Sequence, residues 1–419
     1  MTALLVLAGY VFTLAPTVTF WDAGEFIAAA RTLGIPHPPG TPLFVMIGHV
    51  WAAMVPLADY AQRLNLLSAV LGAAGAGLLF LVAHDTLSRA TADMDPGSGR
   101  LLSIGGGLAA SVIAAFTFTM WQNSNETEVY AAATFTIAAI AWSCLRWREA
   151  RGTPRATHLL LFILYLAGLS IGNHLLALLV GPAVVAFLVA TLHGAPASQP
   201  ERRAAEWAEA AVVAGTWALL IGGGLGSTAL TAIGGLCYLA ALVIAVRARH
   251  SLFAVVALGI AAIGVTSYLF LYIRAGQHPI LNEAQPDNWD RLLAVIRREQ
   301  YPVRTPFDDP TVPHGPDNPG RSGRILGLQL LNYFQYFDWQ WARALADGIR
   351  QPVTLLFVTL GLRGLWEQRR SDRAASWLLL GIFLVTWLGL VGYMNFKPGF
   401  SLALAQWPNL DDHEVRERD

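Results

Sequence analysis

Two carboxylates near the start of the chain have a spacing that suits acid–base chemistry. Asp22 and Glu25 follow an apolar run that ends at Phe20, and residues three apart share one face of a helix. A carboxylate at the edge of an apolar segment can have its pKa raised towards values useful for taking a proton from a hydroxyl group. The alternative is structural, because Thr19 or Asp22 could cap the helix with its side-chain oxygen. These residues alone leave both interpretations open.

One histidine lies in the proline-rich turn that follows the acids. His37 stands in the segment PHPPGTP (36–42), in which four prolines restrict the backbone on both sides of it. A stiff loop holds an imidazole in one position, which suits a ligand-binding group. A single histidine can also be a structural hydrogen-bond partner, so His37 remains a candidate.

Polar residues also gather where two further apolar segments begin or end. Glu126 and Tyr130 are four residues apart and would share a helix face, although acids at a helix N-terminus are also favoured by its dipole. A polar pair between two membrane segments is costly unless it lines a cavity or is satisfied between helices. The candidates of this kind are Asn125, Glu126, Glu128 and Tyr130 at one point and Asn173 and His174 at another.

Arginines and their neighbours form a third set of candidates after the apolar segment 252–273. Guanidinium groups bind phosphates through two parallel hydrogen bonds and keep their charge near a membrane. Arg274 would leave the membrane at headgroup depth, where it could bind a specific lipid phosphate or merely extend towards ordinary headgroups. The set comprises Arg274, Arg297, Arg298, Glu299, Gln300 and Tyr301.

The composition indicates a membrane protein. Of the 419 residues, 55% are hydrophobic and 13% are charged, whereas soluble domains carry about 25% charged residues. The net charge is zero, so nothing indicates a nucleic-acid partner. Cys144 and Cys237 lie in apolar runs and are expected to be core residues. The sequence contains no GxxxxGKS or GxxxxGKT loop, no HExxH and no CxxC, which disfavours an ATP-driven machine.

The elements that must position the candidate residues are membrane helices, and we expect an all-α polytopic membrane protein. A spanning helix needs about 20 mostly apolar residues. Residues 41–56 are apolar but short, so they predict a re-entrant or interfacial helix. Eleven spans are expected, at 2–20, 62–84, 101–121, 127–146, 157–172, 174–192, 207–222, 228–246, 252–273, 351–366 and 374–394.

We expect these spans to form a single membrane domain over residues 1–419. A first outer loop at 21–60 and a large outer loop at 274–350 connect them on one side. Within the large loop, residues 291–300 and 324–342 predict helices, and the second is rich in the Trp and Tyr that favour a membrane interface.

Arginines are distributed unequally between the two sides of the predicted bundle. The short loops on the side of Asp22, near 121–127, 172–174 and 223–227, contain no Lys or Arg. Because positive residues concentrate in cytoplasmic loops, Asp22 is predicted to face outward. The arginines of the opposite loops are Arg89, Arg100, Arg146, Arg148, Arg151, Arg155, Arg202, Arg203, Arg247, Arg249, Arg363, Arg369, Arg370 and Arg373.

Several segments taken together resemble one family. The opening TLAPTVTFWDAGEFIAAARTLGIPHPPGTPLF is followed, in order, by NETEVY, IGNH, YIRA, RREQYP, NYFQYFDWQW, NFKPG and EVRERD. These motifs resemble a family of predicted membrane glycosyltransferases of the GT-C class, which is related to the eukaryotic transmembrane protein 260, a protein O-mannosyltransferase. The resemblance covers essentially the whole chain and depends on the combination of motifs.

The resemblance implies a multi-span, GT-C-like fold with an active site on its outer face. The donor would be a sugar on a polyprenyl phosphate, with mannose as the sugar. The acceptor would be a hydroxyl, such as that of Ser or Thr in an exported protein, or of a glycan. An acidic residue of the first outer loop would be the general base of an inverting displacement. Asp22 matches that position, and Glu25 would support it or contact the acceptor.

The other candidates are expected to bind donor or acceptor. From charge and position, His37, Arg274 and Arg298 are candidates for contact with the donor phosphate. No metal is assigned, although Asp22 and Glu25 leave the need for a divalent cation open. The remaining candidates for binding are Asn125, Glu126, Glu128, Tyr130, Asn173, His174, Glu299, Gln300 and Tyr301.

The resemblance also bears on location and length. The protein is expected to cross a bacterial inner membrane many times, with membrane lipid around it and its active face in the periplasm. Family members continue beyond EVRERD with further spans, so the chain is expected to be truncated at its C-terminus.

Two other functions fit the composition. A transporter or lipid flippase would place ionisable residues near mid-membrane and show repeated, broken helices. A non-catalytic scaffold would present a flat outer surface. The polar residues gather at one face and no repeat is visible, which favours the enzyme.

Overall fold

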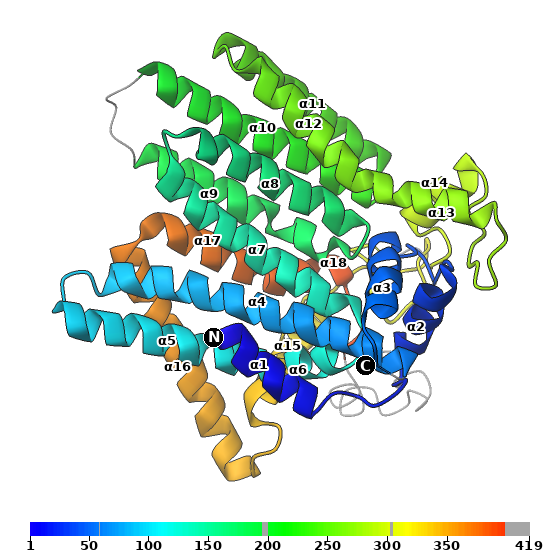
Figure 1. Ribbon diagram of the computed structural model, residues 1–419, viewed down its shortest axis with the longest axis horizontal. Coiled ribbons are helices and arrows are strands. Elements are labelled where there is room, and N and C mark those ends of the chain that lie inside the picture. Colours follow the sequence, from blue (N-terminus) through cyan, green and yellow to red (C-terminus); the bar gives the residue numbers. More distant parts are fainter. Residues whose placement is uncertain (58, 195–199, 302–304, 399–419) are drawn as a thin grey trace. The chain divides into compact units, whose positions relative to one another are not determined.

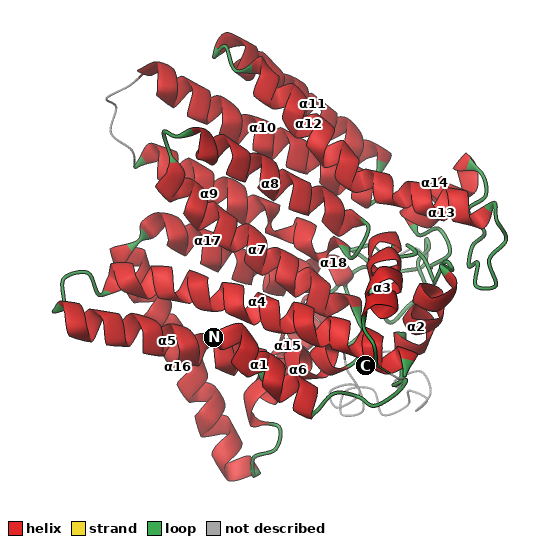
Figure 2. Cartoon of the chain, viewed as in Figure 1, coloured by secondary structure: helices red, strands yellow, loops and turns green. Residues whose placement is uncertain are grey.

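The computed structural model describes residues 1–57, 59–194, 200–301 and 305–398. Within these ranges the chain is helical, and its one extended pairing is a parallel bridge between Ile35 and Asn282 (Figure 2). Turns of 3₁₀ helix cover Leu175–Val180 and Thr266–Tyr268, and a π-helical turn covers Val385–Gly389. The α-helices (Figure 1) are α1 (Thr2–Phe12), α2 (Ala23–Thr32), α3 (Pro42–Met54), α4 (Tyr60–Ala90), α5 (Pro96–Ala115), α6 (Phe118–Asn125), α7 (Val129–Ala150), α8 (Pro154–Ile171), α9 (Gly181–His193), α10 (Pro200–Gly224), α11 (Thr228–Arg247), α12 (Ser251–Val265), α13 (Leu269–Ala275), α14 (Trp289–Arg297), α15 (Gly323–Ala342), α16 (Asp347–Ser371), α17 (Arg373–Leu384) and α18 (Leu390–Met394).

Nine helical segments in the described part of the chain are long and apolar enough to cross a membrane. They coincide with nine of the eleven expected spans, which confirms a multi-pass, all-α integral membrane protein. The expected span 351–366 lies in α16, which is 25 residues long but too polar to belong to this set. The nine segments are Tyr60–Ala90, Pro96–Ala115, Val129–Ala150, Pro154–Ile171, Leu175–His193, Pro200–Gly224, Thr228–Arg247, Ser251–Ala275 and Arg373–Met394.

The first expected span, 2–20, is longer than the helix that forms there. α1 ends at Phe12, and its 11 residues rise only about 16 Å. Pro16 accounts for the difference, because proline disfavours helical geometry at the residue before it and has no N–H to donate. The carbonyls of Ala15 and Thr17 instead accept hydrogen bonds from the buried Asn65 amide on α4, at 2.9 and 3.0 Å.

The shorter predicted helices are also present. α3 occupies the apolar segment expected at 41–56, α14 the segment at 291–300, and α15 the aromatic segment at 324–342. The segment 157–192 divides into α8 and a second helix that begins as a 3₁₀ turn at Leu175.

Glycines allow α10 and α11 to pack backbone to backbone. A Cβ added at Gly222 would lie 2.4 Å from the backbone nitrogen of Thr231, and one at Gly234 would lie 2.7 Å from the backbone of Ala218. Small residues at such contacts are typical of membrane helices, whose association depends on close van der Waals packing.

The contacts within the chain divide it into two compact units, and the single membrane domain expected over 1–419 stays a prediction. The first unit comprises Met1–Gln300 and Leu365–Ile382, and the second comprises Tyr301–Gly364 and the chain from Phe383 onward. The boundary at Tyr301 falls inside the outer loop expected at 274–350. The segment EVRERD, on which the expected truncation depends, lies outside the described residues.

A buried amide network holds the second unit together. Gln329 on α15 is fully buried and donates a hydrogen bond to the Asn395 side chain at 3.1 Å. Asn395 in turn donates to the carbonyls of Thr305 and Asp308, at 2.8 and 2.7 Å. These contacts fix the loop after residue 304 to α15 and to the end of α18.

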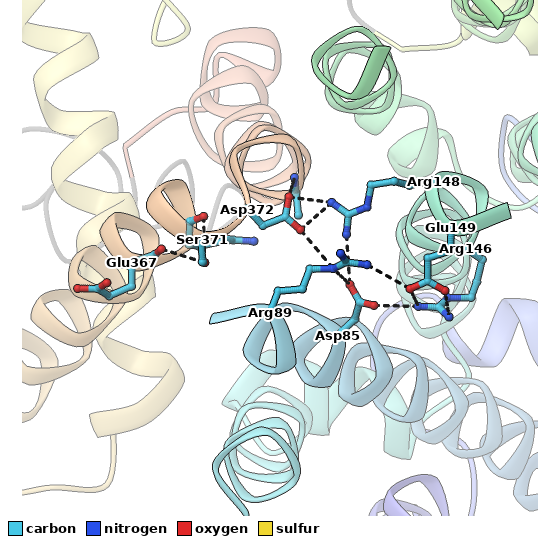
Figure 3. Close-up of polar contacts among 10 residues, drawn as sticks. Asp85, Arg89, Arg146, Arg148, Glu149, Glu367, Ser371 and Asp372 are labelled. Atoms are coloured by element: carbon cyan, nitrogen blue, oxygen red, sulfur yellow. Dashed lines mark hydrogen bonds and ion pairs between the residues drawn. The ribbon is translucent and has the colours of Figure 1, made fainter. Parts of the chain in front are cut away.

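In the first unit, an ion network joins α4 and α7 to the start of α17 (Figure 3). Arg148 on α7 donates two hydrogen bonds to Asp372, at 2.6 and 2.7 Å, and one to Asp85 at 3.3 Å. Arg89 and Arg146 also donate to Asp85, at 3.1 and 2.9 Å. The network lies at the C-terminal end of α4, where the sequence places arginine-rich loops.

At the other end of α4, the first outer loop packs against the segment that follows α13. The backbone N–H of Ile35 donates to the Leu281 carbonyl at 2.8 Å, and the N–H of Glu283 donates to the Ile35 carbonyl at 3.0 Å. Arg274 donates to the carbonyls of Thr32 and Leu33 at the end of α2, at 2.8 and 2.6 Å. Residues far apart in the sequence therefore meet beside α2 and α3 (Figure 1).

Candidate functional site

Asp22 stands at the start of α2 without serving it as a cap. It occupies the N-cap position, but its carboxylate accepts no hydrogen bond from the first turn, and 56% of the side chain is exposed. The preceding residue, Trp21, has a positive φ of 63°, which turns the chain sharply before the helix. The carboxylate of Asp22 therefore does not cap α2, which is the structural alternative for this residue.

Glu25 and Asp22 both face His37, a contact that their spacing alone does not predict. Glu25 accepts hydrogen bonds from the backbone N–H of His37 at 2.7 Å and from its Nδ1 at 2.5 Å. The other ring nitrogen, Nε2, lies 3.9 Å from Asp22 Oδ2. The proline-rich loop thus places the imidazole of His37 between the carboxylates of Asp22 and Glu25.

His37 and Glu25 each favour the charged form of the other. The hydrogen bond to Glu25 raises the pKa of His37, against an opposing effect of burial. Burial favours a higher pKa for Glu25, but the side-chain and backbone hydrogen bonds from His37 outweigh it and lower the pKa. Both shifts favour an imidazolium beside an ionised carboxylate.

A further acid in this group is absent from the predicted site. Glu283 reaches it because its backbone pairs with Ile35, and burial together with the charge of Glu25 raises the pKa of Glu283. The sequence contains no local signal for this, since Glu283 lies in an irregular stretch of the outer loop. Only the long-range bridge between Ile35 and Asn282 brings it close.

Glu128 is a buried carboxylate beside Asp22. It is 6% exposed, and burial, followed by the charges of Asp22 and Glu126, raises its pKa to about 7. Its backbone N–H donates to Ser68 at 3.3 Å, and the Thr127 hydroxyl donates to Asn65 at 2.6 Å. Asn65 therefore ties the loop before Asp22 and the loop before α7 to the same turns of α4.

Asn65 and Ser68 are missing from the predicted site. Both are polar residues in the first turns of a span that is otherwise apolar, and that feature could have identified them. Their role is to position the loops, since their partners are mainly backbone groups.

One predicted feature around residue 126 is wrong. α7 begins at Val129, and Glu126 has extended geometry (φ −130°, ψ 165°), so Glu126 and Tyr130 do not share a helix face. Asn125 faces α1, where its side chain contacts the Thr13 hydroxyl at 2.9 Å and its carbonyl accepts from Ala15 at 3.1 Å. These contacts give Asn125 a packing role at the end of α6.

The polar pair between α8 and the next span borders the site, and each of its side chains makes one hydrogen bond to the backbone. Asn173 is buried and donates to the Val129 carbonyl at 3.2 Å. His174 accepts a hydrogen bond at Nδ1 from the N–H of Leu176 at 3.1 Å, and its ring lies 5.1 Å from that of Tyr130. Burial and the charge of Arg298 lower the pKa of His174 to about 4, so its imidazole is neutral at physiological pH.

The arginine candidates have different surroundings. Arg274 uses three of its five N–H groups on the carbonyls that end α2 and on Gln277, which explains the end of that helix. Arg298 ends α14 with a positive φ of 56°, and its half-buried guanidinium pairs with no described residue. Glu299 pairs with Arg297 at 3.6 Å, and Gln300 is exposed. Tyr301, the last candidate, begins the second unit.

Asp22, Glu25 and His37 also have the composition of a metal site. One ligand atom of each lies within 4.8 Å of the others, and no other such group occurs in the described part of the chain. Because Glu25 is bonded to Nδ1, a divalent cation here would bind Asp22 and Nε2, while Glu25 orients the ring. The need for a metal stays an open prediction.

Asp22, Glu25, His37 and Glu128 lie in the part of the chain that has recognisable relatives. Residues 22–195 match the model of the protein O-mannosyl-transferase TMEM260 N-terminal domain. The protein O-mannosyl-transferase TMEM260 of Mus musculus is 30% identical over 168 residues, which are 40% of this chain and 22% of the relative. The corresponding protein of Dictyostelium discoideum is 31% identical over 77 residues, 18% of this chain and 9% of the relative. The chain therefore spans less than a quarter of each of these curated relatives. No solved structure matches it.

Proposed function

We propose that this chain, which is related to protein O-mannosyl-transferase TMEM260 over residues 22–195, is an integral-membrane glycosyltransferase. It moves a mannosyl group from a polyprenyl-phosphate donor to a hydroxyl of a protein, such as Ser or Thr of an exported chain. The observation that supports this most directly is the position of Asp22. Its carboxylate is not used as a helix cap, faces an imidazole and lies in the matched region.

In the proposed reaction, Asp22 is the general base. The carboxylate takes the proton of the acceptor hydroxyl as its oxygen attacks the anomeric carbon of the donor. The bond from that carbon to the phosphate oxygen breaks on the opposite face, which inverts the configuration. The polyprenyl phosphate leaves with the electron pair as an anion, so cationic and N–H groups near it lower the barrier.

Glu25 and His37 are positioning residues in this scheme. Glu25 fixes the ring through two hydrogen bonds, and the ring presents Nε2 to Asp22. The imidazole thereby lies beside the carboxylate that takes the proton in this scheme. Glu128 and Tyr130 border Asp22 and are proposed to contact the acceptor.

The proposal includes a location. Arginines gather at the ends of the spans that lie away from Asp22, so we place the Asp22 face on the non-cytoplasmic side, in a bacterium the periplasm. Arg89, Arg146 and Arg148 are at the opposite end of α4, consistent with this orientation.

The direct test is transfer by membranes that contain the chain. They are incubated with a radiolabelled polyprenyl-phosphate mannose and a Ser/Thr-rich peptide, and the labelled product is identified after alkaline release. We expect mannose on the peptide, with inverted anomeric configuration. Movement of the labelled lipid across vesicles without any covalent product would instead favour a flippase and overturn the proposal.

A further inference from the structure

We infer that Arg298, His174 and Tyr268 form a binding site for a phosphate group. Under the proposed function, on which the identity of the ligand rests, this is the phosphate of the lipid-linked donor. A Cβ added at Gly172, two residues before His174, would lie 2.2 Å from Ser267 Oγ, so the end of α8 packs against the turn that contains Tyr268. The Arg298 guanidinium interacts electrostatically with His174 and Tyr268, and no described acid pairs with it.

Tyr268 contributes a buried hydroxyl to the inferred phosphate site. It ends the 3₁₀ turn after α12, is 4% exposed, and its hydroxyl has no hydrogen-bond partner among the described residues. A buried hydroxyl without a partner is unfavourable, so the Tyr268 hydroxyl is available to a ligand that accepts its hydrogen bond. Tyr268 is absent from the predicted site, because a tyrosine within an apolar span is unremarkable in sequence.

The hydrogen bond at His174 fixes which ring nitrogen can donate. The backbone N–H of Leu176 donates to Nδ1, so Nδ1 carries a lone pair. In the neutral imidazole the proton must then be on Nε2, which makes Nε2 a donor. The neighbouring charge of Arg298 adds to burial in keeping the ring neutral.

Arg298 provides the charge. It has a left-handed conformation (φ 56°) at the end of α14, a position where glycine is the usual residue. The guanidinium interacts electrostatically with both His174 and Tyr268. Its neighbour Arg297 differs, because it is paired with Glu299 and 44% of its side chain is exposed. An arginine held in an unfavourable backbone conformation without a partner suits bidentate contact with a phosphate.

The site lies next to the proposed base. The ring of Tyr130 packs against His174, and Tyr130 lies within electrostatic range of Asp22. In the inferred arrangement, the phosphate at Arg298 leaves from one side of the sugar while Asp22 activates the acceptor on the other. Arg274 suits this role less, since three of its N–H groups are already bonded.

The test is equilibrium binding of radiolabelled polyprenyl phosphate to the purified full chain in detergent. Arg298→Ala should weaken binding about 10-fold or more, because it removes charge-assisted hydrogen bonds. Tyr268→Phe removes one hydroxyl and should weaken binding about 3-fold or more without lowering the melting temperature. Arg297→Ala is the matched control and should change affinity less than about 2-fold.

Competing ligands identify the source of the phosphate. Inorganic phosphate should displace the lipid only at far higher concentration, and phosphatidylcholine should not displace it. Affinities of Arg298→Ala and Tyr268→Phe that equal the wild-type value would overturn the inference, as would an equal loss in Arg297→Ala.

Transfer assays on the same variants separate the two proposals. If Arg298→Ala transfers mannose with unchanged kcat and KM, the phosphate site is wrong and the glycosyltransferase stands. If binding depends on Arg298 and Tyr268 but no preparation forms a glycosylated product, the phosphate site stands and the proposed reaction is wrong.

Discussion

Charged side chains are paired at one end of α4 and largely unpaired with opposite charge at the other. Asn65 and Arg89 are 24 residues apart, about 36 Å along a helix, which is enough to cross the hydrocarbon core of a bilayer. At the Arg89 end, Asp85 and Asp372 are each paired with arginines (Figure 3). At the Asn65 end, acids face acids, and the guanidinium of Arg298 has no partner in the described chain.

The different arrangement of charges at the two ends of α4 indicates that one end contributes to stability and the other to function. Charges that neutralise one another hold helices together, and removing one of them leaves its partner buried and unpaired. Charges that repel one another, or stay unpaired, cost stability and persist at sites that receive a ligand. We therefore expect substitutions at the paired end to lower stability and substitutions at the acidic end to lower activity.

The largest expected effect on stability is at Asp372. This side chain is 7% exposed and accepts both short hydrogen bonds from Arg148. Asp372→Asn should lower the free energy of unfolding by about 3–5 kcal/mol, measured as thermal unfolding in detergent. Asp93→Asn, in the exposed loop before α5, is the control and should change little. Normal stability with lost turnover would break the comparison.

Neutralising Glu128 should raise stability, in contrast to Asp372→Asn, because the charge of Glu128 is unfavourable in the folded protein. Its pKa is raised from 4.5 to about 7, so between these values the folded chain keeps a proton that the unfolded chain has lost. Stability therefore falls as pH rises through this window. Glu128→Gln should exceed the wild type at pH 8 by up to about 3 kcal/mol and match it near pH 4.5. A pH profile of unfolding that parallels the wild type would refute this origin of the shift.

A smaller effect is expected at Glu25. The raised pKa of His37 and the lowered pKa of Glu25 stabilise the fold most fully between their ordinary values, 4.5 and 6.5. This contribution is lost as pH rises through the raised value or falls through the lowered one. Glu25→Gln should cost about 1–2 kcal/mol at pH 6 and reduce transfer about tenfold. Glu299→Gln, whose partner is the exposed Arg297, should cost less than about 0.5 kcal/mol and serves as the control.

The sequence predicts the helices far better than the contacts between them. Hydropathy identifies nine spans, because their apolar character is local, and the arginine pattern places the candidate residues of the first unit at the ends away from the arginine loops. The end of α1 at Phe12 depends on a proline together with a distant asparagine, Asn65. Glu283 joins the site through a bridge that spans almost 250 residues, for which periodicity has no signal.

The same limit applies to roles. Asp22 and His37 could be proposed from spacing and stiffness, because they are neighbours in sequence. The sequence does not show whether an arginine is paired, so Arg274 and Arg298 are equivalent in sequence and differ only in their contacts.

The most direct measurement of the central claim is mannose transfer by Asp22→Asn beside Asp93→Asn in the same membranes. The substitution keeps size and shape, and 56% exposure without a capping bond means that folding should not change. We predict a fall in transfer of about 10²–10⁴-fold with an unchanged melting temperature, as expected for loss of a general base. Transfer equal to that of Asp93→Asn would contradict the account, because the acidic end would then not be where the reaction occurs.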